Sequence, residues 1–189
     1  CWEAIKEANR DCLILAGALA PVPADLSQEL ALDDLTFLER MYAAGAAPLF
    51  DALAVHAYGW VYPPDDRPDP GKVNFRRSEL LRQIMVAHGD GHKPAYVTEA
   101  GWNDHPRWTR AVSPAQRLDY TVRAYDVALR EWPWCEAVAM WAFRFPWPQR
   151  SYQDYFAFVT PEFRLRPVYE AVRAYSRSCW MARDSHQTV

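Results

Sequence analysis

The sequence has little net charge and no long apolar run. Its 189 residues carry a formal charge of −3 at pH 7, and no basic run stands out. Binding to nucleic acid or to an anionic membrane surface depends on clustered Lys and Arg, so neither partner is expected. The apolar stretch from Leu13 to Pro21 is much shorter than the roughly 20 residues of a membrane-spanning helix. No membrane partner is therefore predicted.

Metal and nucleotide signatures are also missing. The four cysteines, Cys1, Cys12, Cys135 and Cys179, are far apart, with no Cys-x-x-Cys and no His pair at ligand spacing. A zinc site is therefore not expected, and although the spacing does not decide between disulfides and free thiols, we favour buried free thiols. No Gly-x-Gly-x-x-Gly or Walker sequence follows an expected strand, so no nucleotide cofactor is expected. We predict no metal and no cofactor.

The composition does favour one globular unit, because half of the residues are apolar and the length suits a single sizeable core. The chain opens on Cys1, and Trp2 to Ala8 already has the pattern of a helix without a capping residue ahead of it. This indicates a piece of a longer polypeptide. Localisation stays open, with secreted and cytoplasmic locations both compatible.

Apolar runs and breakers predict alternating strands and helices after that first helix. The strands are expected at Cys12–Ala18, Phe50–Tyr58, Ala95–Ala100 and Glu136–Ala142, the first of them buried on both faces. The helices are expected at Asp33–Ala44, Phe75–Ala87, Ser113–Arg130 (opening with a capping box) and Pro167–Tyr175. This order implies parallel strands joined by crossover helices, as in doubly wound sheets and (β/α)8 barrels.

Three of the strands share a design that favours the barrel. Each has tiny residues low on one face and a large polar or aromatic residue near its carboxyl end, namely Tyr58, Glu99 and Trp141. In barrels the interior is crowded, and active sites form at the carboxyl ends of the strands. Strict alternation along the third strand would place Val97 and Glu99 on the same face. By itself, Glu99 could be an ordinary, partly solvated residue at a strand end.

Four short motifs, in this order and spacing, resemble the C-terminal half of a clan A glycoside hydrolase, the (β/α)8 group that includes families 5 and 39. They are Ala16–Pro21, His56–Tyr58, Val97–Trp102 and Met140–Ala142, with Asp154–Val159 closing the match. The resemblance implies a partial catalytic domain over residues 1–182. The terminal residues 183–189 are expected to form a disordered tail. The resemblance also implies that the four strands are the fifth to the eighth of the barrel, that Glu99 is the nucleophile, and that the Trp141–Ala142 peptide bond is cis.

The resemblance further implies substrate-binding roles for neighbours of Glu99. Apart from the resemblance, His56 and Tyr58 are expected at the same height on the neighbouring strand, where they could donate hydrogen bonds to the carboxylate. Trp102 and Trp141 would contact sugar. His56, Tyr58 and Trp141 also fit plain packing. Aromatic side chains that stack on sugars are expected at or after strand ends: Trp60, Tyr62, Trp108, Trp147, Tyr152 and Tyr155. Trp132 and Trp134 precede a strand and are expected to be structural. Substrate contact and plain loop packing are both open for six loop residues: Trp108, Trp147, Asp104, His105, Arg144 and Asp154.

One part of the family pattern is absent. The acid/base Glu of these enzymes follows an Asn at the end of the fourth strand, and no Asn-Glu pair occurs in this chain. Two hypotheses therefore remain: a fragment of a retaining glycosidase that acts on β-linked oligo- or polysaccharides, or a non-catalytic carbohydrate-binding half-barrel. The expected partners are a carbohydrate and either the missing N-terminal half of the barrel or a second copy of the chain.

Overall fold

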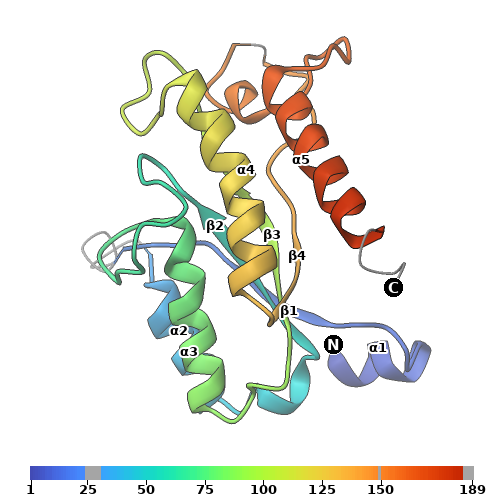
Figure 1. The fold of residues 1–189 in the computed structure, drawn as a ribbon. Coiled ribbons are helices and arrows are strands. Elements are labelled where there is room, and N and C mark those ends of the chain that lie inside the picture. The colour runs from blue at the N-terminus through green and yellow to red at the C-terminus, as the bar shows by residue number, and fades with distance from the viewer. Residues whose placement is uncertain (24–30, 149, 185–189) are drawn as a thin grey trace.

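The computed structural model describes residues 1–23, 31–148 and 150–184, which form an α/β arrangement (Figure 1). One parallel sheet contains the strands in chain order: β1 (Leu15–Leu19), β2 (Ala52–Tyr58), β3 (Ala95–Gly101) and β4 (Cys135–Val138). The helices are α1 (Trp2–Ala8), α2 (Asp34–Ala43), α3 (Ser78–Ala87), α4 (Pro114–Glu131) and α5 (Pro167–Asp184). Short 3-10 turns are η2 (Ala47–Leu49), η3 (Phe75–Arg77) and η4 (Asp154–Phe156). The predicted parallel order is confirmed.

Helix ends follow the local signals in the sequence. The Asp33 side chain accepts a 3.0 Å hydrogen bond from the Thr36 amide and caps α2, and Gly45 follows that helix with a φ of +82°. Ser113 and Gln116 form the predicted capping box at the start of α4, with Pro114 at its first position. These caps fix where the crossover helices begin.

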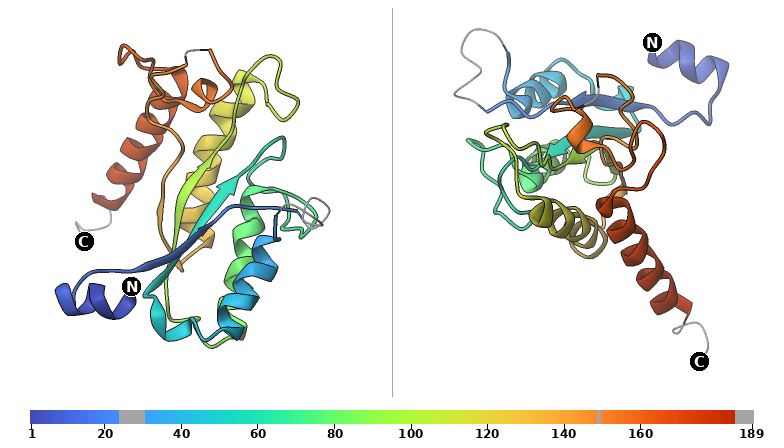
Figure 2. Two further views of the ribbon diagram at one scale, coloured as in Figure 1. Left: turned by 180° about the vertical axis from the view of Figure 1, so that it is seen from behind. Right: turned by 90° about the horizontal axis from the view of Figure 1, so that it is seen from above.

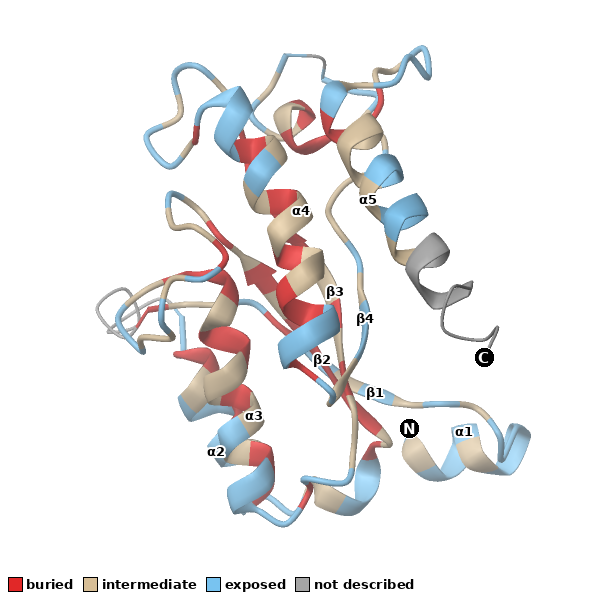
Figure 3. Ribbon diagram, viewed as in Figure 1, coloured by how far each residue is buried: buried red, intermediate tan, exposed pale blue. Residues whose placement is uncertain are grey.

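The core lies between the sheet and the helices that cover one of its faces (Figures 1 and 3). Sheet residues that point into it include Leu53 and Val55 of β2 and Val97 of β3. The helices contribute Leu38, Leu81, Met85, Ala124 and Val127. Because only one face of β2 packs against the helices, larger apolar residues alternate with small or polar ones along this strand.

The opposite face, called here the open face, carries residues that pair across neighbouring strands: Leu15, Ala52, Ala54, Tyr96 and Ala137. Figure 2 shows the helices α2 to α5 following one another around the outside of the sheet, with α1 set apart beside β1. The expectation that the first strand is buried on both faces is wrong. Leu15 is 37% exposed, and only Leu19 of β1 is buried. Within the described residues β1 pairs with β2 alone, so it is an edge strand.

Two further expectations need correction. The last helix was expected to end at Tyr175, with a tail from 183, but α5 continues to Asp184; residues 185–189 lie outside the described part. The Tyr175 hydroxyl donates a 2.9 Å hydrogen bond to Asp126, which joins α5 to α4. All four cysteines are free, but none is buried: Cys1 is exposed and the others are half-buried.

Within residues 1–23, 31–148 and 150–184, no helix is both long and apolar enough to cross a membrane.

Candidate functional site

An irregularity in β3 turns Glu99 onto the open face. Val97 pairs with Val55 of β2, whereas Glu99 pairs with His56, the next residue, so Thr98 is an extra residue in β3. Neighbouring positions of a parallel pair point to the same side, so Val97 faces the core and Glu99 faces away from it. The prediction that these two residues share a face is therefore wrong. The bulge brings Glu99 to the same side as His56.

Glu99 has two polar neighbours on β2. The Tyr58 hydroxyl donates a hydrogen bond of 2.7 Å to Oε2 of Glu99, and Nδ1 of His56 lies 3.6 Å from the same oxygen. The Glu99 side chain is 35% exposed, so it can be reached from solvent. Burial, followed by the hydrogen bond to the Glu99 carboxylate, raises the pKa of Tyr58 well above its usual value of 10. Tyr58 therefore stays a neutral donor at physiological pH.

Trp141 reaches the same rim from the strand on the other side of β3. Its amide donates a 2.8 Å hydrogen bond to the carbonyl of Ala100, the residue after Glu99, so pairing continues beyond the last residue of β4. The Trp141–Ala142 peptide bond is cis, as the resemblance implied. The Phe156 ring contacts both Trp141, at 5.4 Å between centroids, and Tyr58, at 5.5 Å. Tyr58, Glu99 and Trp141 thus share one end of the sheet.

Trp102 does not belong to this accessible group. Its side chain is only 1% exposed, and its indole N–H donates a 2.8 Å hydrogen bond to the Tyr62 carbonyl. The ring packs against Phe75 and Tyr120, and a Cβ built on Gly59 would lie 2.0 Å from it. A side chain enclosed in this way cannot stack on a sugar, so the predicted substrate contact of Trp102 is corrected to core packing.

The other loop candidates divide by their surroundings. Trp147 and Tyr152 are 78% and 48% exposed. The Trp60 ring is covered by the Arg110 guanidinium at 3.6 Å, and Trp108 packs against Tyr152. Asp104, His105, Arg144 and Asp154 each make a packing or polar contact within the protein, to Arg117, Tyr155, Pro161 and Arg166 respectively. These contacts favour a loop-packing role for the last four.

Sequence reasoning missed a buried arginine that holds this rim together. Arg117 of α4 is 4% exposed, and its guanidinium donates to the carbonyls of Phe156 and Ala157 at 2.6 and 2.8 Å. It also pairs with Asp104 at 3.1 Å. Desolvation lowers the pKa of Arg117, and Asp104 opposes that shift. The signal was present, because Arg117 is in helical register with the buried Thr121 and Ala124.

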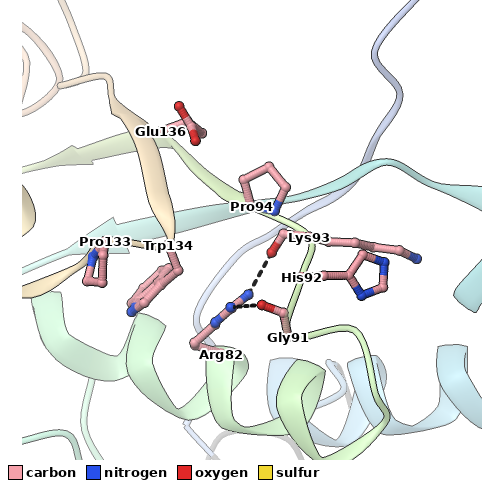
Figure 4. Close-up of a pocket in the computed structure, with 8 residues that line it drawn as sticks. All are labelled: Arg82, Gly91, His92, Lys93, Pro94, Pro133, Trp134 and Glu136. Carbon is pink, nitrogen blue, oxygen red and sulfur yellow. Dashed lines mark hydrogen bonds between the residues drawn. The ribbon is translucent and has the colours of Figure 1, made fainter.

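A pocket at the other end of the sheet has a different character (Figure 4). It lies beside Pro94, which precedes β3, and Trp134, which precedes β4. Arg82 of α3 donates to the carbonyls of Lys93 and Gly91 there, which ties the α3–β3 loop to the helix. Trp132 is 2% exposed and stacks on Trp134, in agreement with their predicted structural role. The carboxylate of interest is at the opposite strand ends.

Comparisons with known proteins point to one class of fold. No family model and no curated protein matches the sequence. A family 39 glycoside hydrolase from the gut symbiont Bacteroides cellulosilyticus WH2 is similar in structure, with a TM-score of 0.68 and 20% identity over 92% of this chain and 35% of that chain. A psychrophilic family 10 endo-β-1,4-xylanase is similar at 0.51 and 17%, over 90% of this chain and 48% of that one. A GH2 β-galacturonidase from Eisenbergiella tayi is similar at 0.50 and 19%, over 69% and 24%.

These neighbours are glycoside hydrolases, as the sequence motifs led us to expect. At such identities the likeness establishes the fold, which is α/β with a four-stranded parallel sheet, consistent with half of a (β/α)8 barrel. The chain spans about a third of the family 39 enzyme and about half of the xylanase.

Proposed function

We propose that this chain is the C-terminal half of a retaining glycosidase barrel, with β1 to β4 as the fifth to eighth strands and Glu99 as the nucleophile. The observation that carries the proposal is the 2.7 Å hydrogen bond from Tyr58 to Glu99 at the carboxyl end of the sheet. That end of the strands is where barrel enzymes place their chemistry. The likeness to glycoside hydrolase structures supports a glycosidase origin.

The geometry suits a nucleophile in several ways. The hydrogen bond from Tyr58 orients the carboxylate, and Nδ1 of His56 lies 3.6 Å from the same oxygen, too far for a hydrogen bond. Attack on an anomeric carbon requires a carboxylate that a sugar can reach, and the Glu99 side chain is 35% exposed. Trp141 supplies an aromatic face at the same rim for the apolar C–H face of a β-linked sugar.

Protonation of the leaving oxygen, in the first step of the reaction, needs a second carboxyl group besides Glu99. Retaining enzymes place a protonated carboxyl roughly 5 Å from the nucleophile to protonate the leaving oxygen. In the family that the motifs resemble, that Glu follows an Asn, and no Asn-Glu pair is present here. The same observation favours the second candidate function, a carbohydrate-binding half-barrel without turnover.

A substrate whose leaving group departs without protonation distinguishes the glycosidase half from the binding module. The 189-residue chain is incubated with 2,4-dinitrophenyl 2-deoxy-2-fluoro-β-glucoside and the corresponding xyloside, and its peptides are analysed by mass spectrometry. In the expected reaction a carboxylate oxygen of Glu99 forms a bond to the anomeric carbon while the bond to dinitrophenolate breaks. The fluorosugar then stays on Glu99 as an ester.

Glu99→Gln is the matched control, because the amide keeps the shape and loses the attacking charge. An adduct on Glu99 that is absent from this variant supports the nucleophile. An adduct on another residue, or equal labelling of the variant, contradicts it. Binding of β-linked oligosaccharides without any adduct, measured by calorimetry, favours the binding module, and neither adduct nor binding rejects both functions.

A further inference from the structure

The chain exposes more surface than a compact monomer of its mass. Its solvent-accessible area is 11164 Å². A folded monomer of 21.8 kDa is expected to expose about 9,300 Å², so each copy has a surplus of about 1,900 Å². A stable protein interface buries roughly 800 Å² on each partner. The surplus is large enough for an extensive interface.

Part of the exposed surface is a pair of sheet edges. Within the described residues β1 pairs with β2 only and β4 pairs with β3 only, so each strand has an outer side without a neighbouring strand of the sheet. Such edges expose N–H and C=O groups that another strand can pair with. Because all four strands are parallel, a rotation of 180° about an axis along the strands places β1 of one copy next to β4 of the other, in parallel.

The open face between these edges is apolar below the carboxyl ends of the strands, where Glu99 and His56 lie. Leu13 and Leu15 are 49% and 37% exposed, and Ala137 and Ala139 of the other edge are also exposed. Tyr96 contributes a half-buried ring between them. A net charge of −3 per copy sets up only weak repulsion between two copies. Burying such surface stabilises an assembly by roughly 25 cal/mol for each Å² removed from water.

We infer that two copies of this chain associate through the β1 and β4 edges and the open face into a two-fold, closed eight-stranded barrel. The occupant of the open face is thus a second copy. A (β/α)8 barrel closes with eight parallel strands, and two copies of this chain supply that number. Closure would pair the β1 and β4 edges of both copies. This pairing goes beyond the proposed activity and does not require Glu99 to be a nucleophile.

The pairing has a consequence for the site at the strand ends. It encloses both Glu99 side chains at the same end of one barrel, four strands apart in an eight-stranded ring. In the resembling family the acid/base ends the fourth strand of its half, whereas Glu99 lies on the third strand of each copy. The second copy therefore closes the site without supplying the acid, and the dimer is expected to bind sugar without turnover.

The test measures mass in solution for the 189-residue chain and three lysine variants. Leu15→Lys and Ala137→Lys place charges on the open face at the two edges, and Val86→Lys is the control on the exposed side of α3, where Val86 is 56% exposed. Light scattering after size exclusion is run over a wide range of concentrations, and circular dichroism checks that each variant folds. All three sites are half or largely open in the single chain, so the fold should tolerate lysine.

We expect a mass of twice 21.8 kDa for the chain and for Val86→Lys. The two open-face variants should dissociate at least roughly 100-fold more readily, because each dimer would enclose two unpaired ammonium groups. Amides of β1 and β4 should also exchange hydrogen more slowly in the dimer than in these variants. A monomer at all concentrations, an open-ended series of larger assemblies, or a dimer that Leu15→Lys and Ala137→Lys leave intact overturns the pairing.

Discussion

The Tyr58 hydroxyl and Nδ1 of His56 approach the same oxygen of Glu99, at 2.7 and 3.6 Å. They can do so because the extra residue Thr98 shifts β3 by one position relative to β2. Without that bulge the carboxylate would point into the apolar layer under the helices, where an unpaired charge is costly. The bulge is therefore the feature that turns a strand-end glutamate into an accessible, oriented group.

Tyr58→Phe should lower stability in a way that depends on pH. At neutral pH the variant loses a hydrogen bond to a charged and partly exposed carboxylate, which costs about 1 to 2 kcal/mol in the free energy of unfolding. The pKa of Tyr58 is raised in the folded state, so the neutral phenol contributes stability fully below about pH 10 and loses it as the pH rises further. Urea unfolding at several pH values measures both effects.

The difference between the chain and Tyr58→Phe should consequently shrink above pH 10, by at most about 1.4 kcal/mol for each pH unit. The pKa of Tyr42 is raised as well, by burial and by its hydrogen bond to Asp90, so Tyr42→Phe gives the matched comparison for an alkaline effect far from Glu99. A Tyr58→Phe difference that stays constant up to pH 12 would contradict the assigned burial of the phenol.

Gly59→Ala should destabilise the fold by about 1 to 3 kcal/mol, because the new methyl group would collide with a buried ring. A Cβ at this position lies 2.0 Å from Cε2 of Trp102, which is enclosed and cannot move aside cheaply. The control is Gly91→Ala, where a Cβ meets its nearest neighbour, Val86, at 3.5 Å. We expect that control to change stability by less than about 0.5 kcal/mol in the same denaturant titration. Equal effects of the two substitutions would show that Trp102 is not packed as described.

Arg117→Met should disrupt the rim around Phe156. It removes the donor to two buried carbonyls and leaves Asp104 without its cation, which costs about 3 kcal/mol or more. Near-ultraviolet circular dichroism should also change, because Phe156 contacts Tyr58, Trp108 and Trp141. Arg123→Met on the exposed side of the same helix removes only surface ion pairs, and it should cost less than about 1 kcal/mol and leave that spectrum unchanged. An unaltered spectrum in Arg117→Met would show that Arg117 does not hold the aromatic side chains around Phe156 in place.

Much of this fold could be predicted from the sequence because local signals and burial agree. The apolar face of β2, the caps of α2 and α4 and the position of Tyr58 follow from periodicity and capping chemistry. The fourth strand, expected to run to Ala142, instead ends at Val138, before Trp141. The bulge at Thr98 could not be predicted in this way, since an extra residue in one strand is decided by pairing with its neighbour.

The burial of particular side chains was harder to predict. A tryptophan after a strand end suits a sugar platform as well as a core, and only the approach of Gly59 and Tyr62 decides for Trp102. The first strand reads as fully buried because its residues are apolar, yet burial also requires partners on both sides, and β1 has one within the described chain.

Acid should loosen the amino-terminal segment before the rest of the fold. The Lys6 ammonium donates to Asp51 at 2.8 Å, and the Ile14 amide donates to the same carboxylate oxygen at 2.8 Å, so Asp51 links α1 and the approach to β1 to the start of β2. These two hydrogen bonds, that of Lys6 first, lower the pKa of Asp51 below its usual value of 3.8. A carboxyl with a depressed pKa contributes stability above its unfolded value and loses it as the pH falls through its folded value. Below about pH 4 we therefore expect faster hydrogen exchange in residues 2–14, corrected for intrinsic rates, while α4 stays protected.

Asp51→Asn should show the fast exchange already at pH 7 and little further change in acid. If residues 2–14 keep the same protection at pH 3 and pH 7, the Asp51 carboxylate does not anchor this segment.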